Sequence, residues 1–142
     1  MADYIASITG ADVFELIPSV PYPADYNQCG EVALAERDGN MRPGIRSLPS
    51  SLSGYRRIFI GYPIWWHTAP MIIGTFLNSF DLSGIDIYPF SQSASMDQAQ
   101  FENSVGFVAD NAPGAAVHEG LFARASDTAA IKAYISGIGH RE

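Results

Sequence analysis

The segment RIFIGYPIWWHTAP, residues 57–70, decides the fold because it joins a strongly apolar run to an unusual loop. Ile58, Phe59 and Ile60 are branched or aromatic and uncharged, which is typical of a strand buried on both faces. Both tryptophans of the chain follow directly, together with a histidine and two prolines. We therefore expect a buried strand from Ile58 to Tyr62 that ends in a rigid, proline-bracketed loop.

Three further segments are short, apolar and bounded by Gly, Pro, Asp or Ser, and these features predict strands. They are residues 13–17, 85–90 and 116–122. Helical spacing separates them, with expected helix starts at Asp25, Pro70, Ser95 and Ser126. An opening helix over residues 2–9 stops at Gly10. Strands that alternate with helices predict a three-layer α/β sandwich around a parallel sheet.

The composition is that of a folded chain. Of the 142 residues, 47% are hydrophobic and 16% are charged, which lies far from the profile of a disordered protein. The length suits one domain, so we expect residues 1–142 to form a single unit.

The charge balance bears on partners and compartment. Fifteen acidic against eight basic side chains give a net charge of −7, which argues against nucleic acid and anionic membranes and favours basic partner proteins. The lone Cys29 suits a reducing compartment. Residues 1–9 lack the pattern of a signal peptide, and no apolar run is long enough to span a membrane, so we expect a cytoplasmic protein.

Ligands of open parallel sheets bind outside the carboxyl ends of the strands, where the tryptophan loop is expected. Trp65 and Trp66 could form the wall of a site for a flat molecule. Alternatively, the two side chains only cover the sheet edge, with each indole N–H bonded locally. The sequence leaves both interpretations open.

Several motifs resemble a flavodoxin-like family of small bacterial proteins. They begin with ADVFEL at 11–16, PYPADY at 21–26 and GYPIWWHTAP at 61–70. They continue with TFL at 75–77, DLSG at 81–84, IYPF at 87–90 and EGL at 119–121. The resemblance covers nearly the whole chain and implies the flavodoxin fold.

The resemblance also implies a site for flavin mononucleotide (FMN) and transfer of one or two electrons. The matching loops would contact the flavin ring through Pro63, Ile64, Trp65, Trp66, His67, Thr68, Ala69, Ser91, Gln92 and Ser93. An aromatic, apolar pocket in an acidic protein disfavours the reduced flavin anion and lowers the reduction potential. Electrons would pass to a redox partner protein or a small-molecule acceptor.

The chain departs from the family pattern at its start. The family's phosphate-binding loop, T-x-T-G-N-T, has no counterpart in this sequence, and Met1 matches a point within the family's first helix. The matching first, central strand is therefore missing as well. In the family this strand lies between the two that match the strands expected at 13–17 and 58–62. Without it, these two strands would stand about 9.6 Å apart, twice the usual strand spacing. Direct pairing of these neighbours, an upstream segment, or a strand from a second copy in a homodimer could close the gap.

A second departure is SQSASMDQ at 91–98, where relatives carry a glycine-rich loop. Asp97 would repel an anion, although the hydroxyl and amide groups of this stretch could still bond a flavin. FMN binding is therefore expected to be weakened or lost relative to the family.

The remaining candidate residues carry less information. His67, His118 and His140 show no metal-ligand spacing, and Cys29 has no basic residue near it in sequence. His67 could assist proton delivery to a bound ring, or could be a solvated loop histidine.

Two functional hypotheses follow. The first is an FMN-binding electron carrier or small FMN-dependent oxidoreductase. The second is a cofactor-free binding or assembly module on the same fold that has lost FMN phosphate binding. The tryptophan loop favours the first, and the absent phosphate motif favours the second.

Overall fold

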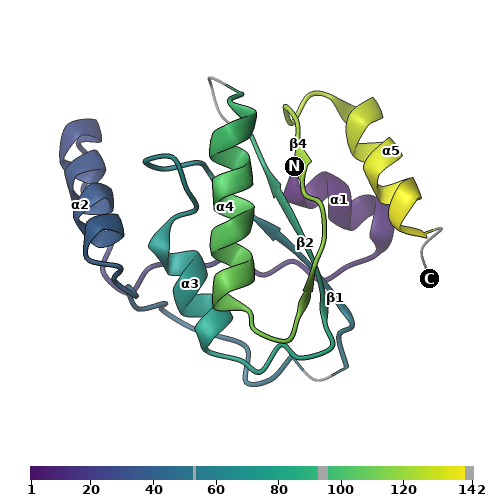
Figure 1. Ribbon diagram of the computed structural model, residues 1–142, viewed down its shortest axis with the longest axis horizontal. Helices are drawn as coiled ribbons and strands as arrows, with labels where there is room; N and C mark the ends of the chain where they lie inside the picture. Colours follow the sequence, from purple (N-terminus) through teal and green to yellow (C-terminus); the bar gives the residue numbers. More distant parts are fainter. Residues whose placement is uncertain (53, 93–95, 140–142) are drawn as a thin grey trace.

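A parallel sheet forms the middle layer of the protein in the computed structural model, which describes residues 1–52, 54–92 and 96–139 (Figure 1). Its strands are β1 (Arg57–Gly61), β2 (Asp86–Ser91), β3 (Ala116–Val117) and β4 (Leu121–Phe122). β2 lies at the centre and pairs with β1 on one side and with β3 and β4 on the other, always in parallel. The predicted α/β fold with a parallel sheet is confirmed.

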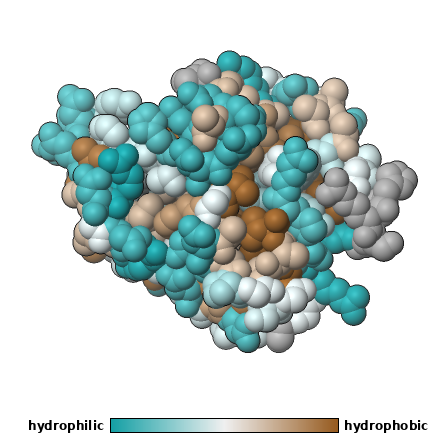
Figure 2. Space-filling view, viewed as in Figure 1, coloured by the Kyte–Doolittle hydropathy of each residue, from teal (hydrophilic) through white to brown (hydrophobic). Residues whose placement is uncertain are grey.

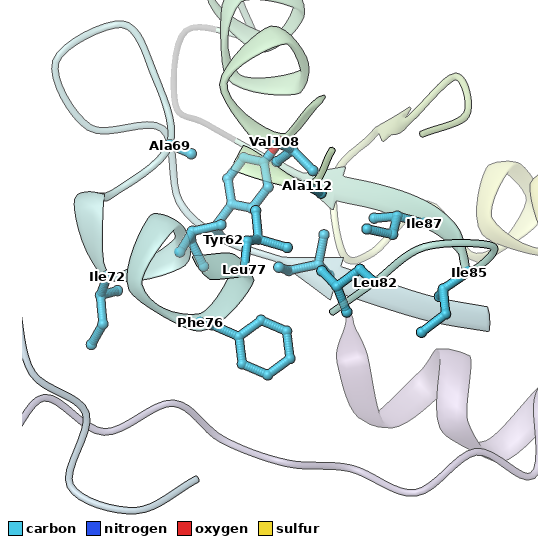
Figure 3. Close-up of a cluster of buried hydrophobic side chains, with 12 residues drawn as sticks. Tyr62, Ala69, Ile72, Phe76, Leu77, Leu82, Ile85, Ile87, Val108 and Ala112 are labelled. Atoms are coloured by element: carbon cyan, nitrogen blue, oxygen red, sulfur yellow. The ribbon is translucent and has the colours of Figure 1, made fainter. Parts of the chain in front are cut away.

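One face of the sheet is covered by α3 (Met71–Asn78) and α4 (Gln98–Asn111). Alternate side chains of the two long strands, such as Ile60 and Ile87, enter this larger core. Figure 3 shows Leu77 and Val108 of the two helices packed with Tyr62, which follows β1. Ile87 and Val108 are fully buried, so this layer fixes the position of the end of β1.

The opposite face carries α1 (Ala2–Thr9) and α5 (Thr128–Gly139). Ile5 of α1 and Ile131 of α5 are buried against Phe90 of β2 and Leu121 of β4. Gly10 ends α1 in the left-handed conformation with φ 74°, as the sequence predicts. The two helical layers and the sheet make the expected three-layer sandwich.

The helix α2 (Tyr26–Asp38) lies to the side of the sandwich (Figure 1). Ala33 is its only buried residue, and the Asp25 side chain caps its start by accepting a 2.9 Å hydrogen bond from the Gln28 N–H. The predicted capping residue is thus confirmed. Because its core contribution is small, α2 is available for contacts with the loops.

The strand predicted at residues 13–17 is wrong. The segment forms no strand, and Val13 and Phe14 are 56% and 49% exposed. Its backbone is bonded at its end, where the Ile17 carbonyl oxygen accepts a 2.7 Å hydrogen bond from the Arg46 N–H. A strand needs a neighbour to bond its backbone groups, and in the described residues the outer edge of β1 offers no such pairing. Direct pairing of residues 13–17 with β1 is therefore excluded as the way the gap closes.

The single strand predicted at residues 116–122 is divided into β3 and β4. The cause lies in β2, where Pro89 falls between the residues that pair with β3 and those that pair with β4. Proline has no N–H to donate, so the ladder breaks opposite it. Gly120, just before β4, lies very close to Pro89. A side chain would not fit here, because a Cβ at this position would lie 2.8 Å from the Pro89 carbonyl oxygen.

Two predicted helix starts are displaced. α4 is capped by Asp97, which accepts from the Gln100 N–H, two residues after the expected Ser95. Ser95 lies outside the described residues. α5 is capped by Asp127, which accepts from the Ala130 N–H, one residue after the expected Ser126. In both places a carboxylate takes the role assigned to a nearby hydroxyl.

The surface on the side seen in Figure 1 is mostly hydrophilic around an apolar centre (Figure 2). None of the helices within the described residues is both long and apolar enough to span a membrane.

Candidate functional site

The loop after β1 is a tight hairpin. Trp65 and Thr68 bond to each other in both directions, with N–H to carbonyl oxygen distances of 2.9 and 3.2 Å. Trp66 and His67 form the two-residue turn with φ values of 51° and 68°. Bulky residues rarely adopt this left-handed conformation, which costs about 1–3 kcal/mol per residue and persists only where the surroundings impose it.

The surroundings that impose it belong to α2. The Trp66 indole N–H donates a 2.7 Å hydrogen bond to the carbonyl oxygen of Gly30. The Arg37 guanidinium donates a 3.0 Å hydrogen bond to the carbonyl oxygen of Trp66. The side chain and the backbone of one turn residue are therefore both held by the same helix.

A second contact fixes Trp65. Its ring meets the edge of Tyr22 at a centroid distance of 5.2 Å and an interplanar angle of 84°. The Tyr22 hydroxyl donates a 2.6 Å hydrogen bond to a carboxylate oxygen of Glu36 in α2. Partial burial and this bond to Glu36 raise the pKa of Tyr22 far above its ordinary value, so the phenol stays protonated and keeps donating.

The base of the loop is locked to the sheet and to α4. The Ser91 hydroxyl donates to the Tyr62 carbonyl oxygen at 2.5 Å, which ties the ends of β1 and β2 together. The Tyr62 hydroxyl shares a 2.8 Å hydrogen bond with the buried Ser104 hydroxyl. Burial raises the pKa of Tyr62 to about 12, so this phenol is neutral under ordinary conditions.

The structure brings most of the predicted ring-binding residues to one edge of the sheet, beyond the carboxyl ends of β1 and β2. Within the loop, Pro63, Trp66 and His67 are exposed, Ile64, Trp65 and Thr68 are half-buried, and Ala69 is buried. Trp66 is 41% exposed, so its ring lies at the surface and does not fill the interior.

The second predicted stretch, residues 91–93, differs in which side chains are free to contact a ligand. Ser91 is buried, and its hydroxyl is already bonded to the Tyr62 carbonyl. Gln92 is exposed, and its side-chain oxygen accepts a 2.6 Å hydrogen bond from the Ala125 N–H. Ser93 lies outside the described residues. Ser91 therefore has a structural role at this edge, whereas Gln92 lies at its surface.

Three residues that position the loop were not assigned a role from the sequence: Tyr22, Gly30 and Arg37. Tyr22 belongs to the PYPADY stretch, which carries the family resemblance but no chemical signature of its own. Gly30 acts through its backbone, and Arg37 lies 29 residues from its partner. Contacts of this kind depend on tertiary packing, which the local sequence does not reveal.

The sequence profile of the flavodoxins matches residues 1–138 of the chain. The protein belongs to the flavodoxin family. No curated protein sequence matches it.

Solved structures agree with this family. A candidate flavoprotein from Bacteroides eggerthii is 31% identical with a TM-score of 0.84, over 97% of this chain and 87% of that one. A second from Bacteroides uniformis is 30% identical with a TM-score of 0.81, over 95% and 87%. A flavoprotein from Lactobacillus acidophilus, in complex with FMN, shares the fold at 22% identity and a TM-score of 0.70, over 85% and 81%.

Of the other candidates from the sequence, Cys29 lies in α2 next to Gly30, and His140 lies outside the described residues. His118 approaches Asp86 with 2.7 Å between Nε2 and Oδ1, and its ring stacks on Tyr88. Among the described residues, no group of three histidine, cysteine or acidic side chains could hold a metal ion.

Proposed function

We propose that this flavodoxin binds the ring of FMN at the hairpin after β1 and carries electrons as a soluble redox protein of the cytoplasm. The observation that carries the proposal is the strained Trp66-His67 turn, held by α2 beside the joined ends of β1 and β2. Strained backbone that is over-determined by its surroundings clusters at functional sites. The FMN complex of the Lactobacillus acidophilus flavoprotein, which has the same fold, supports this choice of ligand.

The loop suits a flat, tricyclic ring. Trp65 is half-buried and fixed by Tyr22, and Trp66 is partly exposed with its N–H already bonded to Gly30. Both indoles therefore keep their orientation without a ligand, which reduces the entropy lost on binding. Ile64, Thr68 and Gln92 would supply the adjacent apolar and polar contacts.

The phosphate of FMN fits the described residues less well. α1 has Met1 at its N-cap position with no side-chain cap, and Asp3 lies in its first turn. A carboxylate there would repel a phosphate at this helix end. The described residues therefore suit the flavin ring better than they suit the phosphate, and ring contacts would supply most of the binding.

When bound, the flavin would supply the chemistry by taking up and releasing one or two electrons. The chain orients the ring through Trp65 and Trp66 and excludes water from the face that they cover. Its acidic character disfavours added negative charge on the ligand and so lowers the reduction potential. His67, exposed at the tip of the turn, is placed to exchange a proton with solvent.

A titration with two ligands tests the proposal. Riboflavin carries the same ring as FMN without the phosphate, so ring-dominated binding predicts dissociation constants that agree within about threefold. Binding is followed by quenching of flavin fluorescence and by the shift of its visible bands. Absence of quenching with both ligands would overturn ring binding at this loop.

A matched pair of variants locates the site. Trp66→Ala removes the exposed indole and its bond to Gly30, and should weaken riboflavin binding by about tenfold. Ser79→Ala alters an exposed hydroxyl that bonds to the Thr75 carbonyl oxygen, and it should leave binding unchanged. Equal binding by the wild type and the Trp66 variant would place the flavin elsewhere. Reduction of the loaded protein and its reoxidation by ferricyanide then test electron transfer.

The redox partner is proposed to be a basic protein, with a small-molecule acceptor as the other option. The net charge of −7 should accelerate encounter with a positively charged surface. Reoxidation by a cationic protein acceptor should therefore slow as ionic strength rises from about 0.01 to 0.15 M, because the screening length falls from about 30 to 8 Å.

The open edge of β1 favours a second candidate function, a binding or assembly module. In the described residues β1 pairs only with β2, and an unpaired edge is a template for another strand. A second copy could complete the sheet as a homodimer. Light scattering over a range of concentrations tests this: a strictly monomeric protein would contradict it, and a dimer with protected β1 amides in hydrogen exchange would support it.

A further inference from the structure

A cavity lies between the sheet and α5, and it shares no residue with the loop proposed for the flavin. Its volume is about 250 Å³. The described residues that line it include Tyr88, Glu119, Gly120, Tyr134, Gly137 and Ile138. An apolar cavity of about 150 Å³ accepts benzene, so this volume has room for one ring and a short side arm.

Two small, exposed residues of α5 line this cavity. Ala133 and Gly137 are one helical turn apart, and both line the space. A Cβ built on Gly137 would meet no atom within 4 Å. Because neither position carries a large side chain, the hollow stays open to the surface.

Tyr88 contributes a buried side chain to this hollow. The residue is only 4% exposed, and it lines the cavity. No hydrogen bond to its hydroxyl exists within the described residues, although this oxygen is not sealed off inside the protein. The hydroxyl is therefore open to solvent or to a ligand that can bond it.

Neighbouring rings hold Tyr88 in place. It stacks on His118 at a centroid distance of 4.5 Å and an angle of 8°, and on Phe59 at 5.5 Å and 28°. Tyr134 of α5 meets it edge-on at 6.4 Å and 83°. The Tyr134 hydroxyl donates to the Glu119 carbonyl oxygen at 2.7 Å, which fixes the opposite wall. The cavity is thus preorganised.

The negative charge at the cavity indicates which class of ligand it would bind. Among the described lining residues, Glu119 is the only acidic or basic one, and the whole chain carries a net charge of −7. A carboxylate beside two phenol rings favours a cation with an aromatic body, because the rings accept the ring of the ligand and the carboxylate accepts its ammonium group.

We propose that this cavity binds a small, single-ring aromatic amine. The ring would pack against Tyr88 and Tyr134, and the ammonium group would lie between the Tyr88 hydroxyl and Glu119. This inference goes beyond flavin binding and does not depend on it.

The test uses three probes of nearly the same size on the full chain: 2-phenylethylamine, neutral 2-phenylethanol and anionic phenylacetate. Calorimetry should give a dissociation constant below about 1 mM for the amine and at least tenfold weaker binding of the other two. Amide NMR shifts should concentrate around Gly120 and Gly137. Equal binding of the alcohol or the acid would overturn the assignment to amines, and no binding of the amine would overturn the site.

Variants connect binding to the cavity. Gly137→Leu should fill the hollow and abolish amine binding while the protein stays folded, because a Cβ at this position has space. Glu119→Gln should weaken amine binding by about tenfold and leave 2-phenylethanol unaffected. His67→Ala, in the flavin loop, should leave amine binding unchanged. Amine binding that survives Gly137→Leu, confirmed as folded by its thermal transition, would contradict the proposal.

Discussion

The indole N–H of Trp66 donates a 2.7 Å hydrogen bond to the carbonyl oxygen of Gly30, across 36 residues of sequence. This bond connects the tip of the proposed flavin loop to α2, a helix that buries little else. The same helix bonds the Trp66 carbonyl through Arg37. α2 therefore holds both the side chain and the backbone of Trp66, and substitutions at single residues can measure how much each bond stabilises the loop.

Trp66→Phe keeps an aromatic ring but removes the donor to Gly30. We expect the free energy of unfolding to fall by about 0.5–1.5 kcal/mol, the usual net value of one hydrogen bond, as measured by urea denaturation. Gly30→Ala is the matched control. Its added Cβ would lie 3.8 Å from the Trp66 ring, an ordinary contact, and alanine should raise helix stability by about 0.8–1 kcal/mol. An unchanged midpoint for the Phe variant would show that α2 does not hold the loop.

His67→Gly should stabilise the protein. His67 has φ 68°, a conformation that glycine adopts without steric cost, so we expect a gain of about 1 kcal/mol in the free energy of unfolding. His67→Val is the opposite control, because a β-branched side chain disfavours this conformation, and should lower stability. If both variants lowered the unfolding midpoint equally, the side chain of His67 and not its backbone would be the important feature.

The sequence was sufficient to predict the fold because that information is local. Alternation of apolar strands with capped helices, the left-handed Gly10 and the Asp25 cap are confirmed. The strand at 13–17 was wrong because strand formation depends on a neighbour distant in sequence. For the same reason the sequence did not predict the contacts that Tyr22 and Arg37 make with the tryptophan loop, because these residues lie far from the loop along the chain.

Tyr62→Phe should change the stability at alkaline pH. The folded pKa of Tyr62 is raised from 10.0 to about 12 by burial, so the unfolded chain loses this proton first as pH rises. The stabilisation is complete below pH 10 and is lost between about pH 10 and 12, with a slope of up to about 1.4 kcal/mol per pH unit.

Across this range the free energy of unfolding should fall less steeply with pH for the Phe variant than for the wild type. The difference in slope should correspond to the release of about one proton. Below pH 10 the variant should be about 0.5–1.5 kcal/mol less stable, because the bond to Ser104 is lost. Identical slopes for both proteins would mean that Tyr62 does not titrate differently in the two states.

Gly74→Ala and Gly106→Ala should have opposite effects although both glycines lie in helices. A Cβ on Gly74 would fall 2.8 Å from Nε of Arg42 and 3.0 Å from the Phe107 ring. Arg42 cannot easily retreat, because it donates to the side-chain oxygens of Asn78 at 2.8 Å and Asn111 at 2.7 Å.

We therefore expect Gly74→Ala to lower the free energy of unfolding by about 1–3 kcal/mol, as overpacking does. Gly106 is exposed with no atom within 4 Å of a built Cβ, so Gly106→Ala should raise stability by about 0.8–1 kcal/mol through helix propensity alone. Urea denaturation of both variants measures the two signs. A stabilised Gly74 variant would mean that the Arg42 network between α3 and α4 rearranges at little cost, and that it does not fix the spacing of these helices.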